Sequence, residues 1–148
     1  GNNMVHSLMY GGAKVGMHVT CACPAGYEPD PEVVAAARAD GAATGAKMDV
    51  VRDPKEAVRG ADILYTDVWA SMGQEAEREK RVRDFQGYQI NAELVGMANP
   101  DCIVMHCLPA HRGEEITDDA ADGAHSVLWD EAENRLHAQK AILALTMS

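Results

Sequence analysis

Short apolar segments alternate with helical patterns along almost the whole chain, and this alternation is the feature that most constrains the fold. The apolar segments have the length of strands, and the segments between them carry helix caps and terminators. Pro31–Asp40, for example, follows Asp30 as N-cap, has a proline in its first turn and ends at Gly41. The alternation predicts an α/β fold: a doubly wound, mostly parallel sheet with helices on both faces, in a single Rossmann-like domain.

The positions of the elements follow from the same patterns. Strands are expected at residues 17–21, 48–51, 63–66, 103–106 and 126–128. Helices are expected at residues 4–10, 31–40, 54–59, 74–83, 92–97 and 131–146. Only Gly1–Asn3 precede the first helix, although a capped helix in such folds normally follows a strand. We therefore expect the first strand of the fold to be missing from this chain.

Composition excludes several classes of function. The chain has 148 residues, of which 47% are hydrophobic and 24% charged, values typical of one soluble globular domain over residues 1–148. Its formal net charge is −10 and no basic stripe is present, which argues against a nucleic-acid partner. The apolar runs are too short for a membrane span, and no signal peptide opens the chain. We expect a cytoplasmic protein without a membrane or nucleic-acid partner.

The four cysteines lie at positions 21, 23, 102 and 107, a spacing that forms no Cys-x-x-Cys motif. Cys21 and Cys23 are two residues apart in an expected strand, so they share a face and are expected to pack as small apolar residues. A metal site that joins them to His18 or His106 is the alternative, but these spacings fit no usual zinc pattern. We expect no metal and no cofactor.

Polar residues follow two of the expected strands at the point where each ends. Asp67–Gly73 follow the strand at 63–66, and His106–Arg112 close the strand at 103–106. Ligands of open parallel sheets bind beyond the carboxyl ends of the strands, so these loops and Asn3 mark one candidate site. Carboxylate, hydroxyl, amide and backbone N–H groups together suit a small zwitterion. Gly11–Gly16 follow a helix instead of opening one, which excludes a dinucleotide fingerprint.

Each candidate residue also has a simpler explanation. Cys107, before Pro109, is either a buried core thiol or a group that faces a ligand, and the residues alone leave both open. His106 points to the opposite face of its strand, which argues against a cysteine hydrolase. Asn3 could cap a helix. Arg135 could form a surface ion pair with Glu131, four residues earlier.

Four segments together resemble one family, ornithine carbamoyltransferase, in its C-terminal, ornithine-binding half. The segments are Gly1-Asn2-Asn3 with His6-Ser7, Asp67-Val68-Trp69-Ala70-Ser71-Met72-Gly73-Gln74-Glu75, His106-Cys107-Leu108-Pro109-Ala110-His111-Arg112-Gly113, and Trp129-Asp130-Glu131-Ala132-Glu133-Asn134-Arg135. The resemblance spans nearly the whole chain in the same order. It implies a Rossmann-like domain that takes part in carbamoyl transfer from carbamoyl phosphate to the side-chain amine of L-ornithine, giving L-citrulline and phosphate.

The resemblance also implies roles for individual residues. Asn3 and the Met72 backbone would hold the α-carboxylate of ornithine, and Asp67 with Ser71 would hold its α-amino group. Cys107, beside Asp67, would orient the side-chain amine and help to take its proton, so Cys107 and Asp67 are the candidate catalytic residues. The carbamoyl phosphate contacts implied are Cys107, Leu108 and Arg135.

The family's N-terminal carbamoyl-phosphate domain, with its Ser-Thr-Arg-Thr and His-Pro motifs, has no counterpart in this sequence. That domain is therefore an expected partner, and the resemblance implies a homotrimer for the complete enzyme. Two alternatives remain: a non-catalytic amino-acid-binding module, and an unrelated cysteine- or metal-dependent enzyme. The last helix carries two apolar stripes, which require cover either from a groove of this domain or from a partner domain.

Overall fold

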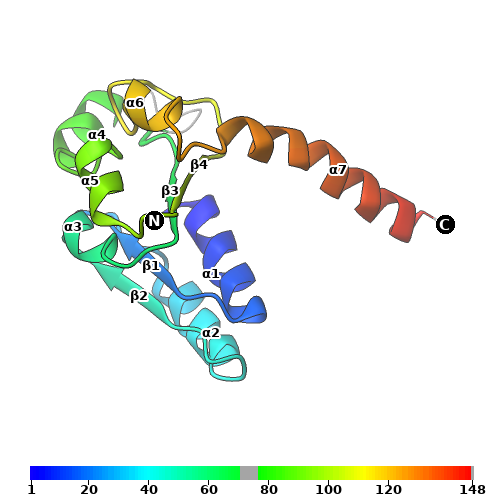
Figure 1. Ribbon diagram of the computed structural model, residues 1–148. Helices are drawn as coiled ribbons and strands as arrows, with labels where there is room; N and C mark the ends of the chain where they lie inside the picture. The colour runs from blue at the N-terminus through cyan, green and yellow to red at the C-terminus, as the bar shows by residue number, and fades with distance from the viewer. Residues whose placement is uncertain (71–76, 148) are drawn as a thin grey trace. The chain divides into compact units, whose positions relative to one another are not determined.

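The architecture is that of a mixed α/β protein, in a computed structural model that describes residues 1–70 and 77–147 (Figure 1). Its strands are β1 (Val19–Ala22), β2 (Met48–Val51), β3 (Ile63–Thr66) and β4 (Ile103–His106). Its helices are α1 (Asn3–Val15), α2 (Pro31–Gly41), α3 (Pro54–Ala57), α4 (Arg78–Asp84), α5 (Ala92–Met97), α6 (Asp118–Ala121) and α7 (Leu128–Thr146). The chain divides into two compact units. The first unit comprises Gly1–Ala57 with Asp84–Tyr88, and the second comprises Val58–Arg83 with Gln89–Ser148.

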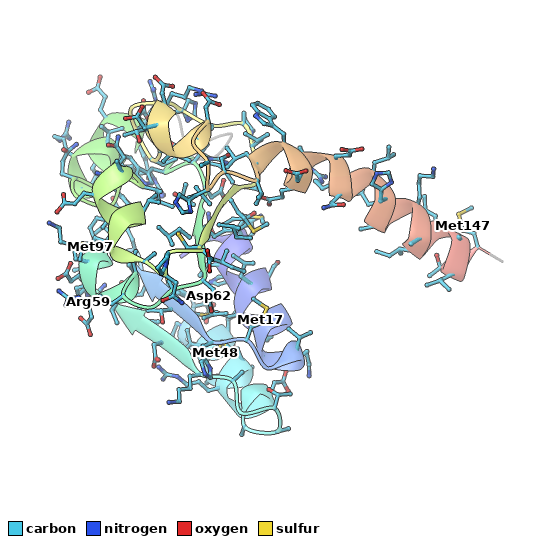
Figure 2. The ribbon with its side chains drawn as sticks, in the orientation of Figure 1. Met17, Met48, Arg59, Asp62, Met97 and Met147 are labelled. Carbon is cyan, nitrogen blue, oxygen red and sulfur yellow. The ribbon has the colours of Figure 1, made fainter. Side chains whose placement is uncertain are left out.

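The first unit is built on one pair of parallel strands. β1 and β2 pair in register from Val19 opposite Met48, and α2 is the crossover between them. A parallel pair requires such a crossover, which is why a helix lies between the two strands in sequence. The core of this unit consists of buried side chains from two helices and β2: Met9, Ala13, Val34, Ala37 and Met48. Met48 is labelled in Figure 2.

Helix α1 begins one residue earlier than expected, and its cap is a different asparagine. The side chain of Asn2 accepts a hydrogen bond from the Val5 N–H at 3.1 Å, and Asn2 itself has an extended backbone. The expectation that Asn3 caps the helix is therefore wrong, because Asn3 is already its first helical residue. At Gly12 a Cβ atom would lie 2.6 Å from Val19 Cγ2, so glycine lets α1 lie close to β1.

The second unit is built on the parallel pair β3 and β4, which are in register from Ile63 opposite Ile103 to Thr66 opposite His106. Asn91 caps α5 by accepting the Leu94 N–H at 3.1 Å. The core gathers buried side chains from strands, helices and loops: Val58, Leu64, Ile90, Leu94, Cys102, Val104, Ile116, Ala120, Ala121 and Leu128. Burial of this apolar surface is the main stabilising contribution to the unit.

The predicted fold class is confirmed, since parallel strands alternate with helices throughout. The strands predicted at 48–51, 63–66 and 103–106 have the predicted bounds. The described strands pair as two two-stranded sheets, one in each unit. The helix predicted at 74–83 falls partly outside the described residues, and its described part is α4.

The strand predicted at residues 126–128 is wrong. Ser126 forms a single parallel bridge with Val104, and the Val127 N–H donates to the Val104 carbonyl at 3.0 Å. The backbone then turns helical at Leu128, so the ladder stops after one bridge. α7 accordingly begins three residues before the predicted start at Glu131.

Helix α7 is anchored to its unit only through its first turn. Leu128 is buried, whereas Leu136, Ile142 and Leu143 are more than half exposed. Figure 1 shows the rest of the helix extending away from its unit, and Figure 2 shows the labelled Met147 side chain near its end. Among the described residues, no groove of its own unit covers this part of the helix. None of the helices described here combines the length and apolar character needed to cross a membrane.

The two ends of α7 are expected to contribute unequally to stability. Leu128→Ala should lower the free energy of unfolding by about 2–5 kcal/mol, because it leaves a cavity in the core. The matched change Leu143→Ala, on the exposed part of the same helix, should lower it by less than about 0.5 kcal/mol. Urea denaturation of the two variants measures both values. Equal losses would show that α7 is buried along its length.

Candidate active site

The register of β3 and β4 brings two predicted site residues together. Thr66 and His106 lie opposite each other as the last residues of their strands, so the residues that follow, Asp67 and Cys107, emerge side by side. The Cys107 thiol donates a hydrogen bond to Asp67 Oδ1, with 3.0 Å between sulfur and oxygen. The prediction that Cys107 lies next to Asp67 is confirmed.

The surroundings keep the Cys107 thiol neutral. Burial and the Asp67 carboxylate raise the pKa of Cys107 to about 12, burial being the larger cause. The same Asp67 oxygen accepts the Val68 N–H at 2.7 Å, which fixes the carboxylate at the strand end. A protonated thiol is a weak nucleophile. The arrangement therefore suits hydrogen bonding to a ligand better than covalent catalysis.

A second carboxylate, from Glu131 in the first turn of α7, adjoins this strand end. Its Oε1 accepts the Tyr65 hydroxyl at 2.9 Å, and its Oε2 accepts the backbone N–H of His106 at 3.0 Å. Burial and the bond to Glu131 raise the pKa of Tyr65 well above its usual range, so the phenol stays protonated. Through these contacts α7 is fastened to both strands at the site.

The turn after β4 has an unusual backbone. Leu108 has φ 53°, in the left-handed region, and the Leu108–Pro109 peptide bond is cis. A left-handed conformation costs a residue with a side chain about 1–2 kcal/mol. The Leu108 N–H donates to His106 Nδ1 at 2.9 Å, and this bond supports the turn. The prediction that His106 does not contact the thiol is also confirmed, because both of its ring nitrogens are engaged elsewhere.

The other predicted site residues are Asn3, Ser71, Met72 and Arg135. Ser71 and Met72 lie outside the described residues. Asn3 belongs to the first unit, at the start of α1. Arg135 lies on the exposed part of α7. The ion pair expected between Arg135 and Glu131 is absent among the described residues, because the Glu131 carboxylate binds Tyr65 and His106 instead.

Metal ligands are also sparse among the described residues. The one group of suitable spacing is His111, Glu114 and Glu115, whose ligand atoms lie within 4.8 Å of one another. Glu114, however, forms an ion pair with Arg78, and Glu115 Oε1 already accepts two hydrogen bonds. These carboxylates therefore have protein partners that compete with a metal ion.

The cysteines near β1 have structural roles. Cys23 is buried, and its backbone oxygen accepts a hydrogen bond from Arg52 at 3.1 Å. Burial, with a smaller effect of Cys23, raises the pKa of Cys21 to about 12. His18 was a candidate ligand for a metal site with these cysteines, but its Nδ1 already accepts the Lys47 N–H at 3.0 Å. Packing as small apolar residues is the interpretation that fits.

Comparison with known proteins shows the family and the fold of the chain. The model of the aspartate/ornithine carbamoyltransferase Asp/Orn-binding domain matches residues 1–146. The chain belongs to this family. It is 61% identical over 148 residues to an ornithine carbamoyltransferase of Symbiobacterium thermophilum, covering 100% of this chain and 48% of that protein. It is 57% identical over 147 residues to the anabolic ornithine carbamoyltransferase of Pyrococcus furiosus, covering 99% of this chain and 47% of that protein.

A solved structure agrees with these sequence relatives. The crystal structure of ornithine carbamoyltransferase from Gloeobacter violaceus superposes with a TM-score of 0.91 at 55% identity, covering 100% of this chain and 49% of that one. The structural neighbours have the Rossmann-like fold predicted for the chain. The chain thus spans about half the length of the relatives it matches, and the matched region is their C-terminal half.

Three residues around the site were not predicted from the sequence. Tyr65 could have been found from strand periodicity, because it shares a strand face with Asp67. Glu131 and Glu115 gave no local signal, since an acidic residue in a helix or loop is usually solvated. Their partners lie in other elements, up to 66 residues away in sequence.

Removal of the Asp67 charge should make the Cys107 thiol more reactive. The carboxylate raises the pKa of Cys107, so Asp67→Asn should lower that pKa and increase the thiolate fraction at pH 8. We expect alkylation of Cys107 by iodoacetamide to become about tenfold faster. Peptide mass spectrometry measures the rate at each cysteine.

Asp62→Asn is the matched control, because Asp62 lies at the opposite end of β3 (Figure 2). It should leave the Cys107 rate unchanged. A Cys107 rate that is equal in both variants would contradict the role given to the Asp67 carboxylate.

Proposed function

We propose that this chain is the ornithine-binding domain of an ornithine carbamoyltransferase, acting together with a carbamoyl-phosphate domain. The reaction is attack of the neutral side-chain amine of L-ornithine on the carbonyl carbon of carbamoyl phosphate. The new C–N bond forms, the C–O bond to phosphate breaks, and L-citrulline and phosphate leave. The single observation that carries the proposal is the Cys107–Asp67 hydrogen bond at the paired strand ends, in a chain of this family.

The thiol–carboxylate pair provides a path for the proton that the amine loses. A neutral thiol can accept this proton only as it gives up its own, and its hydrogen already points to Asp67 Oδ1. Cys107 therefore orients the amine, and Asp67 is the final acceptor on the protein. No covalent intermediate on sulfur is needed, which agrees with the raised pKa of Cys107.

Further residues are proposed to hold the two substrates. Asp67 and Ser71 bind the α-amino group of ornithine, while Asn3 and the Met72 backbone bind its α-carboxylate. Negative charge that develops on the carbamoyl oxygen requires donors. We assign this donor role to Arg135, whose guanidinium forms no ion pair with the described residues. Leu108, whose N–H is already donated to His106 Nδ1, would contact the carbamoyl group through its carbonyl oxygen, which can accept from the carbamoyl NH2.

The two exposed apolar stripes of α7 support the second domain as partner. Leu136 and Leu143 on one stripe and Ile142 on the other are more than half exposed, and large exposed apolar side chains gathered on one helix are typical of an interaction site. We propose that the carbamoyl-phosphate domain covers α7. Contact along this helix would also hold Arg135 next to the substrate of that domain.

The direct test is citrulline formation by a reconstituted enzyme. This chain is mixed with a separately produced carbamoyl-phosphate domain and assayed with ornithine and carbamoyl phosphate. Asp67→Asn should lower kcat at least about 100-fold, because it removes the proton acceptor. Cys107→Ala should lower it about tenfold or more, because the amine loses its orienting group.

Asp62→Asn serves as the control and should keep full activity. A folded mixture that makes no citrulline but binds ornithine would favour the amino-acid-binding module instead. Replacement of ornithine by lysine, putrescine or acetylornithine tests the choice of amine. Turnover of putrescine at the same rate would contradict the proposed binding of the α-amino and α-carboxylate groups.

A further inference from the structure

The side chain of His106 lies behind the site, in the interior of the second unit. It is 1% exposed and uses both ring nitrogens. Nδ1 accepts the Leu108 N–H at 2.9 Å, and Nε2 lies 3.1 Å from Glu115 Oε1. Because Nδ1 is an acceptor, the ring proton must be on Nε2, where it is donated to the carboxylate. The network thus requires the neutral Nε2–H tautomer.

Glu115 is the second member of this pair and is completely buried. Its Oε1 accepts both the His106 Nε2–H and the backbone N–H of His111, the latter at 2.5 Å. Among the described residues its Oε2 has no hydrogen-bond partner. The nearest charged or chargeable group to Oε2 is the His111 ring, whose Nδ1 lies 3.8 Å away, beyond hydrogen-bond distance. A buried carboxylate with one oxygen outside any hydrogen bond is costly compared with an apolar side chain of similar size. Packing alone therefore does not account for a glutamate at this position.

The two side chains enclose the turn that carries the site. Glu115 holds the N–H of His111 after the turn, while His106 holds the N–H of Leu108 within it. Cys107 lies between His106 and Leu108, the two residues that the first of these bonds joins, and its thiol donates to Asp67. The left-handed backbone of Leu108 thus depends on a hydrogen bond whose acceptor is oriented by Glu115.

We propose that His106 and Glu115 are positioning residues, which orient the Cys107 thiol and the Leu108 backbone without touching a substrate. The geometric part of this proposal, the orientation of the Cys107 thiol and the Leu108 backbone, can be tested on this chain without a second domain. Its catalytic part, that loss of the pair lowers turnover, rests on the proposed function. The two parts are therefore tested separately.

The first test is the tautomer of His106 in the unaltered chain. Nitrogen-15 NMR of the histidine-labelled chain at neutral pH distinguishes a protonated nitrogen from an unprotonated one. We expect His106 to have an unprotonated Nδ1 and a protonated Nε2. A protonated Nδ1 would overturn the proposal, because the Leu108 N–H would then have no acceptor. This test requires no variant and no activity.

The second test is the reactivity of Cys107 in variants of the pair. His106→Ala and Glu115→Ala should each make alkylation of Cys107 by iodoacetamide about tenfold faster, because the turn no longer holds the thiol against Asp67. Glu115→Gln retains an acceptor oxygen for both N–H groups and should remain within about twofold of the unaltered chain. His137→Ala is the matched control, because His137 is an exposed histidine of the same unit whose ring nitrogen lies 3.5 Å from Glu133 and contacts neither cysteine. It should leave the Cys107 rate unchanged.

Cys102 separates local positioning from general loss of structure. It is 1% exposed in the core of the same unit, so its alkylation reports unfolding. A rise at Cys107 alone supports the proposal. An equal rise at Cys102 and Cys107, or no change at Cys107, overturns it.

The catalytic part is tested in the reconstituted citrulline assay. His106→Ala should lower kcat about tenfold or more and change the KM for ornithine less than threefold, and Glu115→Gln should restore most of kcat. If the unaltered mixture is active and His106→Ala keeps its kcat, the positioning role in catalysis is wrong. If the unaltered mixture is inactive, the proposed function fails, while the NMR and alkylation results still decide the geometric part.

Discussion

The in-register pairing of β3 with β4 is the constraint on which the site depends. Parallel pairing makes the two strands end together, so one carboxylate and one thiol emerge as neighbours without any long-range adjustment. A shift of the register by one residue would turn the side chains of one strand to the opposite face and separate Asp67 from Cys107. The buried residues Leu64 and Val104 oppose such a shift, because it would expose them. Core packing and site geometry are therefore fixed by the same pairing.

Three carboxylates surround this strand end, and each acts on a different part of it. Asp67 accepts from the thiol, Glu131 accepts from the backbone of His106, and Glu115 accepts from the His106 ring. Each bond links the strand end to another segment of the second unit. The loop that carries Cys107 is consequently held by side chains as much as by backbone pairing. Such anchoring fits the substrate-orienting role proposed for Cys107.

Sequence patterns predicted well those strands whose bounds depend only on residues close together in the chain. β2, β3 and β4 have the predicted bounds because short apolar segments with polar flanks are read directly from the chain. The pair Asp67 and Cys107 was predictable too, since both follow strands. The strand at Ser126 was not predictable, because a single bridge to Val104 ends where the helix begins. Glu115 and Glu131 could not be assigned, because their roles depend on hydrogen-bond partners in other elements.

The exposed length of α7 has a consequence for motion. Only its first turn is anchored, and a free helix of this length is marginally stable in water, since packing supplies most of the stability of protein helices. Its backbone hydrogen bonds should therefore open more often toward the C-terminal end, and amide hydrogen exchange should quicken along the helix. Arg135 lies in the section where this loosening begins. The position of its guanidinium is thus fixed only to the extent that α7 packs against another surface.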